Sequence, residues 1–145
     1  MLYIYLKIFH ILSASCVLAS IVYSFHLWRS IHAYNLAAIS DRIQKQTSLI
    51  IIPFAVLQLA TGFTMISLQR YNWHQFWMGG SVISFITAIA SWFGFIYFLL
   101  LSQQAAVSLH KHTQQPRYRR HQSLMLLICG LGLLSMIFFM ANKIG

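Results

Sequence analysis

Long apolar runs separated by short polar stretches dominate this chain. Four of these runs are long enough, or nearly so, for a transmembrane helix, which needs about 20 largely apolar residues. They cover residues 2–28, 49–68, 76–101 and 124–141. Because the connections are short, consecutive helices must run antiparallel. The pattern therefore predicts an all-α fold, a transmembrane four-helix bundle with up-down-up-down order.

The polar connections show no sign of a second domain. Residues 29–48 either extend the first helix or form an amphipathic segment on the membrane surface. Residues 69–75 form a tight turn, and residues 102–123 are the most polar connection. Without an internal repeat or a low-complexity tract, we expect residues 1–145 to form a single integral membrane domain.

The composition supports a membrane protein and excludes several kinds of chemistry. Only 8% of the residues are charged, whereas soluble domains carry about a quarter. Asp41 is the only carboxylate side chain. Paired-carboxylate catalysis, di-iron carboxylate sites and oxygen-ligand Mg²⁺ or Ca²⁺ sites are therefore excluded. Histidine is left as the only side chain that titrates near neutrality.

The net charge of +9 is consistent with basic residues placed at the surface of a lipid bilayer. The basic residues flank the apolar runs, which favours anionic lipids on the cytoplasmic side as partners and gives no reason to invoke nucleic acid. One side of the membrane would carry Arg29, Arg42, Lys45, Lys111, Arg117, Arg119 and Arg120. The other side would carry Lys7, Arg70 and Lys143. By the positive-inside rule, both termini lie outside, in a multi-pass protein of the bacterial inner (plasma) membrane.

Small residues recur at helical spacing within three of the runs. They are Ser13, Ser20 and Ser24 in the first, Ser81, Ser84, Ala88 and Ser91 in the third, and Gly130 and Gly132 in the fourth. Small side chains let helices approach closely in lipid, where packing drives helix association. We expect these residues to form the helix faces that pack.

Polar side chains inside apolar runs are the candidate sites, because each needs a partner in lipid. At about 1.5 Å per residue, five such groups fall in one layer of the outer half: His10, Gln58, Thr61, Ser84 and Ser135. Imidazole can ligate haem iron while its other nitrogen bonds an acceptor. One hypothesis is therefore a haem b site with His10 as ligand and Gln58 and Ser84 as its hydrogen-bonding neighbours. The alternative is a cofactor-free histidine that bonds Gln58 or Ser84 and holds the helices in register.

A methionine pattern suggests a second kind of site. Met65, Met78, Met136 and Met140 all fall in the outer half, near the level of His10. Thioether and imidazole ligands together suit Cu(I), which would make His10, Met65 and Met136 a copper site. Methionine is also common filler in apolar helices, so the alternative is ordinary packing without a metal.

Four short stretches resemble a known family. They are Leu6-Lys7-Ile8-Phe9-His10-Ile11-Leu12-Ser13-Ala14, residues 53–65 with Leu57-Gln58-Leu59-Ala60-Thr61-Gly62, Tyr118-Arg119-Arg120, and Met136-Ile137-Phe138-Phe139-Met140-Ala141-Asn142-Lys143. Together they resemble the DUF2269 family of bacterial integral membrane proteins, across all four runs. More distantly, the beginning of the chain is similar to HemJ-type protoporphyrinogen oxidases and CopD-type copper-resistance membrane proteins. The first similarity implies a haem ligand at His10. However, the chain lacks the acidic residue of the HemJ fourth helix, and its third run offers no second ligand.

Three functional hypotheses remain open at this stage. The first is a redox-associated membrane protein that binds haem through His10. The second is a non-catalytic accessory subunit of a larger membrane complex, with another protein or a second copy of the chain as partner. The third is a copper-handling protein. No catalytic residue is assigned, and whether the protein is an enzyme stays open.

Overall fold

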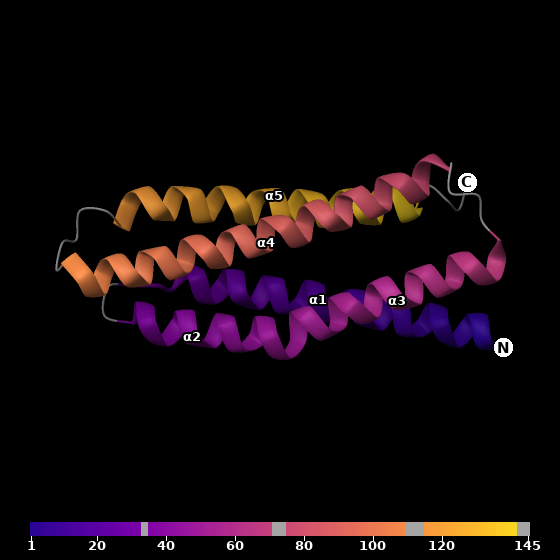
Figure 1. Ribbon diagram of the computed structural model, residues 1–145, viewed down its shortest axis with the longest axis horizontal. Coiled ribbons are helices and arrows are strands. Elements are labelled where there is room, and N and C mark those ends of the chain that lie inside the picture. Colours follow the sequence, from indigo (N-terminus) through magenta and orange to yellow (C-terminus); the bar gives the residue numbers. More distant parts are fainter. Residues whose placement is uncertain (33–34, 71–74, 110–114, 142–145) are drawn as a thin grey trace. The chain divides into compact units, whose positions relative to one another are not determined.

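The computed structural model describes residues 1–32, 35–70, 75–109 and 115–141, which are almost entirely helical (Figure 1). Four helices among them are long and apolar enough to cross a membrane. The all-α class with four transmembrane helices, predicted from the sequence, is confirmed. The position of the termini outside the membrane stays a prediction. Lys111 and Lys143 lie outside the described residues, as do the side chains of Arg117 and Met140.

The chain divides into two compact units, Met1–Asn72 and Trp73–Gly145. The first unit contains the long helix α1 (Leu2–Arg29) and a second long helix that packs against it. This second helix consists of three continuous parts, α2 (Leu36–Gln46), the π-helical η1 (Thr47–Ile51) and α3 (Ile52–Gln69). The two long helices run antiparallel (Figure 1).

Proline explains the π-helical turn in the middle of the second helix. Pro53 has no N–H to donate, and its ring would clash with the carbonyl of Leu49, four residues earlier. Leu49 lies in η1, where the wider π turn relieves that clash. The helix therefore passes the proline without ending, and residues 36–69 form one helical segment.

Residues 29–48, the polar segment before the second apolar run, adopt neither of the two structures expected from the sequence. It neither extends the first helix nor lies apart as a surface helix, because α2 extends the second helix at its N-terminal end. A helix of 34 residues is roughly 50 Å long, against about 30 Å for the hydrocarbon core of a bilayer. The polar end of this helix therefore extends beyond the apolar layer.

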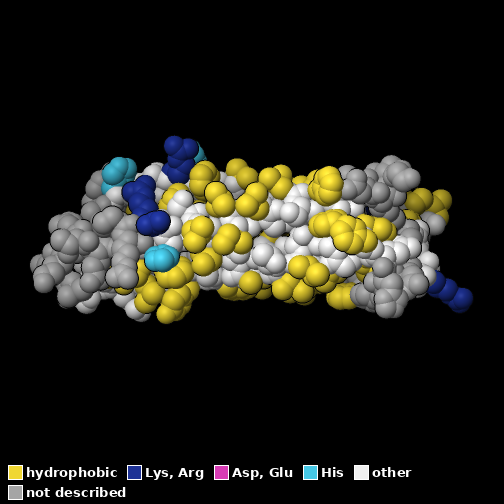
Figure 2. Space-filling model, turned by 90° about the horizontal axis from the view of Figure 1, so that it is seen from above, with side chains coloured by type: hydrophobic (Ala, Val, Ile, Leu, Met, Phe, Trp, Pro, Cys, Tyr) yellow, Lys and Arg dark blue, Asp and Glu magenta, His cyan; other side chains and the backbone are white. Residues whose placement is uncertain are grey.

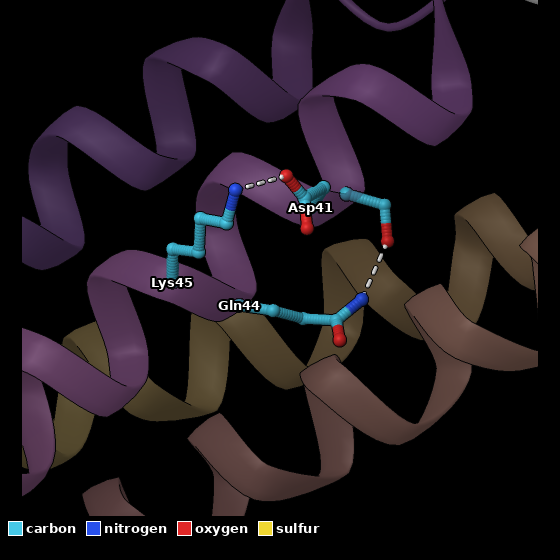
Figure 3. Close-up of polar contacts among 4 residues, drawn as sticks. Asp41, Gln44 and Lys45 are labelled. Carbon is cyan, nitrogen blue, oxygen red and sulfur yellow. Dashed lines mark hydrogen bonds and ion pairs between the residues drawn. The ribbon is translucent and has the colours of Figure 1, made fainter.

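Polar contacts on α2 suit its position outside that layer (Figure 3). Lys45 Nζ lies 3.0 Å from Asp41 Oδ2, one helical turn away, and both side chains are exposed. Gln44 Nε2 donates to Ser40 Oγ at 3.0 Å. The only carboxylate side chain is therefore paired locally with a lysine, at an exposed helix surface.

The second unit is a pair of antiparallel helices, α4 (Phe76–Leu109) and α5 (Gln115–Ala141), which pack along their length (Figure 1). The contact is close at Gly132, where an added Cβ would lie 3.0 Å from Ser84 O and 3.2 Å from Ala88 Cβ. At Gly130, an added Cβ would meet no atom of the described residues within 4 Å. The packing role expected for the small residues is therefore confirmed at Gly132, whereas at Gly130 it stays a prediction.

Both helices of the second unit extend into the connection that looked most polar in the sequence. The apolar runs suggested a helix end at residue 101 and a start at residue 124, whereas α4 continues to Leu109 and α5 begins at Gln115. Backbone hydrogen bonds keep a helix going where side chains turn polar, so hydropathy marks the lipid-compatible part of a helix and not its ends.

The outer surface of the helices is apolar. Only 22–33% of the residues in the most apolar window of each helix are buried inside the protein. On the face shown in Figure 2, hydrophobic side chains cover the middle of the helices, and Lys, Arg and His side chains gather toward their ends. A water-exposed surface of this kind would be unfavourable at roughly 25 cal/mol per Å² of apolar area, so lipid is the solvent this surface fits.

Candidate functional site

A buried polar cluster joins α1 to α3 in the first unit. The His10 ring lies between two side chains of α3, with Nδ1 2.8 Å from Thr61 Oγ1 and Nε2 3.0 Å from Gln58 Nε2. Ser13, one turn after His10 on α1, donates from Oγ to Gln58 Oε1 at 2.6 Å. We refer to His10, Ser13, Gln58 and Thr61 as the His10 cluster.

The cluster is closed to other partners on most sides. Ser13, Gln58 and Thr61 are buried, and the His10 ring is partly buried. Thr61 Oγ1 lies 2.8 Å from Leu57 O, and Ser13 Oγ lies 2.9 Å from His10 O. Each hydroxyl oxygen therefore lies within hydrogen-bond distance of a carbonyl on its own helix and of a side chain across the interface.

The local sequence explains how the cluster assembles. His10 and Ser13 are three residues apart on α1, and Gln58 and Thr61 are three apart on α3, so each pair lies on one helix face. Gly62 follows Thr61, and a Cβ there would lie 3.4 Å from His10 Cε1. The small backbone at this position lets the imidazole lie close to α3.

The structure brings together two of the five residues predicted to form a site. His10 and Gln58 are in contact through a ring nitrogen and a side-chain amide. Met65 lies on α3 roughly 10 Å beyond Gln58, two helical turns away. Ser84 and Met136 belong to the second unit, where the carbonyl of Ser84 faces Gly132. Their part in a site with His10 stays a prediction.

Sequence reasoning missed two members of the cluster. Thr61 was placed in the same layer as His10 but was not recognised as its hydrogen-bond partner. Ser13 was assigned to helix packing alone, yet it bonds the Gln58 amide. The useful signal was the spacing, because the motifs His-x-x-Ser and Gln-x-x-Thr each present two polar groups on one helix face.

The first unit holds a second polar contact of the same kind. Gln46, the last residue of α2, accepts from Ser24 Oγ at 3.1 Å and donates to Ser20 O at 3.1 Å. In the second unit, Gln122 Nε2 donates to Phe98 O and to Ser102 Oγ, both at 3.1 Å. We refer to Gln46, Gln58 and Gln122 as the glutamine clasps, since each bonds groups on the antiparallel partner helix.

The His10 cluster in this arrangement does not fit a haem or a metal ion. A ligating histidine must present the lone pair of one ring nitrogen to the metal, and both nitrogens of His10 face protein atoms at 3.0 Å or less. Among the described residues, no group of three His, Cys, Asp or Glu side chains is placed to hold a metal ion. Ligation by His10 would first require Gln58 or Thr61 to move away.

Comparison with known proteins gives a family and no individual relative. The profile of a family described as predicted integral membrane protein (DUF2269) matches residues 4–143. This agrees with the resemblance seen in the four sequence stretches. No curated protein matches the chain, and no solved structure matches it.

Proposed function

This chain belongs to the DUF2269 family of predicted integral membrane proteins, and from that premise we propose that it is a non-catalytic subunit of a larger membrane assembly. The observation that carries the proposal is the His10 cluster, whose polar atoms bond one another across the α1–α3 interface. A cluster arranged in this way stabilises a helix pair and leaves little to offer a substrate.

The other buried polar groups of the described structure are likewise hydrogen-bonded within the protein. Every buried side-chain nitrogen or oxygen among these residues has a hydrogen-bond partner. The glutamine clasps use their amides between helices, and exposed hydroxyls such as Thr64 and Thr87 donate to a carbonyl of their own helix. Chemistry at an intramembrane site needs a polar group held ready for a substrate, and these groups are held by the protein itself.

The outward faces give the protein its capacity to assemble. Large apolar side chains such as Phe9, Val22, Ile83 and Phe138 point away from their helix pairs and are at least 56% exposed. In lipid, such faces contact either acyl chains or the helices of a partner, by van der Waals packing. A partner helix would therefore dock on these faces without disturbing the cluster inside the first unit.

Site-specific photo-crosslinking in native membranes tests this proposal. A photoreactive amino acid at Phe9, which is 56% exposed, should give a discrete adduct with one partner protein. The same group at Val17, which is 3% exposed, is the matched control on the same helix and should give none. Purification of a partner-free protein with only lipid adducts at Phe9, Val22, Ile83 and Phe138 would contradict the proposal.

We further propose that the protein lies in the bacterial inner membrane with both termini outside. The bacterial inner membrane, both termini outside, and anionic lipids near Arg29, Arg42 and Lys45 follow from the asymmetry of Lys and Arg along the chain. A membrane-impermeant thiol reagent should label an Arg70→Cys variant in intact cells. It should label a Lys45→Cys variant only after the membrane is opened. The reverse labelling pattern would overturn the orientation.

Haem-linked redox chemistry through His10 is the second candidate function, and one contact favours it. A ligating histidine is commonly oriented by an oxygen atom near its other ring nitrogen, and Thr61 Oγ1 lies 2.8 Å from Nδ1. The candidate requires Gln58 to leave Nε2. It predicts a Soret band in the purified protein that disappears in a His10→Ala variant, and a colourless protein after expression with ample haem would remove it. Metal analysis of the same sample tests the copper alternative at His10, Met65 and Met136.

A further inference from the structure

We propose that Ser13 and Thr61 together fix His10 as the Nδ1–H tautomer, so that Nε2 is the only ring atom of His10 with a lone pair. The two residues would act as positioning residues on either side of the ring, one directly and one through Gln58. The inference concerns the chemistry of the His10 cluster and does not depend on whether the chain has a protein partner.

The contact between Ser13 and Gln58 sets the orientation of the Gln58 amide. The side-chain atom of Gln58 that faces Ser13 Oγ lies 2.6 Å from it. Hydrogen bonds between two oxygens span about 2.5–3.0 Å, whereas those from nitrogen to oxygen begin at about 2.7 Å. The atom facing Ser13 is therefore the oxygen. Because an amide oxygen can only accept, Ser13 directs its single hydroxyl proton to Gln58 Oε1 and not to His10 O, which lies farther away at 2.9 Å.

The orientation of the amide determines the state of the His10 ring. With its oxygen directed at Ser13, Gln58 presents its NH₂ group to His10 Nε2 at 3.0 Å. An amide NH₂ can only donate, so Nε2 must accept and cannot carry the ring proton of the neutral imidazole. That proton lies on Nδ1.

Thr61 completes the assignment from the other side of the ring. Thr61 Oγ1 lies 2.8 Å from both His10 Nδ1 and Leu57 O. With the ring proton on Nδ1, Nδ1 donates to Thr61 Oγ1, and the single hydroxyl proton of Thr61 goes to Leu57 O, so that both groups are satisfied. The Thr61 side of the ring is therefore compatible with the tautomer that the oxygen–oxygen distance at Gln58 indicates.

The assignment defines what the cluster could bind. An electron-pair acceptor, such as a transition-metal ion, could reach His10 only at Nε2 and only by displacing the Gln58 amide. A hydrogen-bond donor would meet the same atom. Thr61 would remain bonded to Nδ1 in either case, because its bond is on the opposite edge of the ring.

Nitrogen-15 NMR of the full-length protein with labelled histidine, in lipid bicelles at a pH where imidazole is neutral, tests the assignment. The two neutral tautomers differ in which ring nitrogen shows the shift of a protonated atom. The His10 signals are identified as those lost in a His10→Gln variant. We expect the Nδ1–H form in the wild type and in Thr61→Ser, which keeps the hydroxyl.

Two further variants distinguish an effect on the His10 tautomer from a general loss of protein stability. Thr61→Val removes the acceptor at Nδ1 and should shift His10 at least partly to the Nε2–H form. Thr64→Val, on the same helix but with its hydroxyl bonded only to Ala60 O, should leave the tautomer unchanged. An Nε2–H form in the wild type, or an unchanged tautomer in Thr61→Val, would overturn the proposal.

Discussion

The two units of this protein differ in the balance of contacts that hold their helix pairs together. The first unit joins α1 to its partner through side-chain hydrogen bonds, in the His10 cluster and at Gln46. The second unit has one contact of that kind, at Gln122, and otherwise relies on close approach at glycines, with Gly132 against Ser84 and Ala88 and Gly80 against the Phe139 ring. Of the seven glycines in the chain, only Gly62 belongs to the first unit.

This difference predicts which kind of substitution should destabilise each unit most. Packing in lipid depends on van der Waals contact, so an added atom at a closely packed backbone position has nowhere to go. An interhelical hydrogen bond in a membrane contributes only about 0.6 kcal/mol on average. The second unit should therefore be sensitive to added volume and the first unit to lost polar groups, with the larger effects in the second.

The largest effect is expected from Gly132→Ala in the second unit. The new methyl group would lie 3.0 Å from Ser84 O and 3.2 Å from Ala88 N, and backbone atoms cannot move aside cheaply. We expect a loss of about 2 kcal/mol in the free energy of unfolding, measured by denaturant titration in mixed micelles. Gly130→Ala, where nothing lies within 4 Å, is the control, and an equal loss in both variants would contradict the close-packing account.

Gln58→Leu should have the next largest effect, this time in the first unit. The variant removes the partner of His10 Nε2 and one of the two acceptors near Ser13 Oγ, and it leaves Nε2 without a partner in an apolar interface. The expected cost is about 1 kcal/mol. Gln69→Leu, at the exposed end of the same helix, should cost nothing measurable. If both variants unfold like the wild type, the cluster does not hold the helices.

Thr61→Val should cost less than Gln58→Leu, since one hydrogen bond across the interface is lost and the side-chain volume is kept. We expect about 0.6 kcal/mol by the same titration. Thr64→Val removes a hydroxyl that bonds only within its helix and should be neutral. A larger loss in Thr64→Val than in Thr61→Val would show that the outer face of α3 matters more than the cluster.

The smallest effect is expected for Asp41→Asn on α2. The Asp41–Lys45 pair lies 3.0 Å apart but both side chains are more than half exposed, and exposed pairs of this spacing contribute about 0.3–0.5 kcal/mol. Added salt should abolish the difference from the wild type. A loss comparable to that of Gln58→Leu would mean that the projecting end of the helix has a structural role of its own.

Hydropathy located the membrane-compatible parts of the four helices because apolar runs are a direct consequence of lipid exposure. It could not show that α2 continues the second helix, since polar residues are compatible with helix, turn or coil. Hydropathy could not predict the π-helical turn before Pro53 either, because a proline in the sequence is normally taken to end a helix. Helix ends depend on backbone hydrogen bonds that hydropathy does not measure.

The site was partly predictable for a similar reason. Depth along each helix placed His10 and Gln58 in one layer, and the two are in contact. Depth says nothing of which face a side chain occupies, so Thr61 and Ser13 were not recognised as partners. Ser84 was grouped with His10 by depth alone, although it belongs to the second unit.

A double-mutant cycle between His10 and Gln58 tests the central claim most directly. The four proteins are the wild type, His10→Ala, Gln58→Ala and the double variant, each compared by its free energy of unfolding in cofactor-free micelles. We expect a coupling of at least about 0.6 kcal/mol, because each single variant already removes the bond. Additive losses, within roughly 0.3 kcal/mol, would show that the two residues do not stabilise the helix pair through each other.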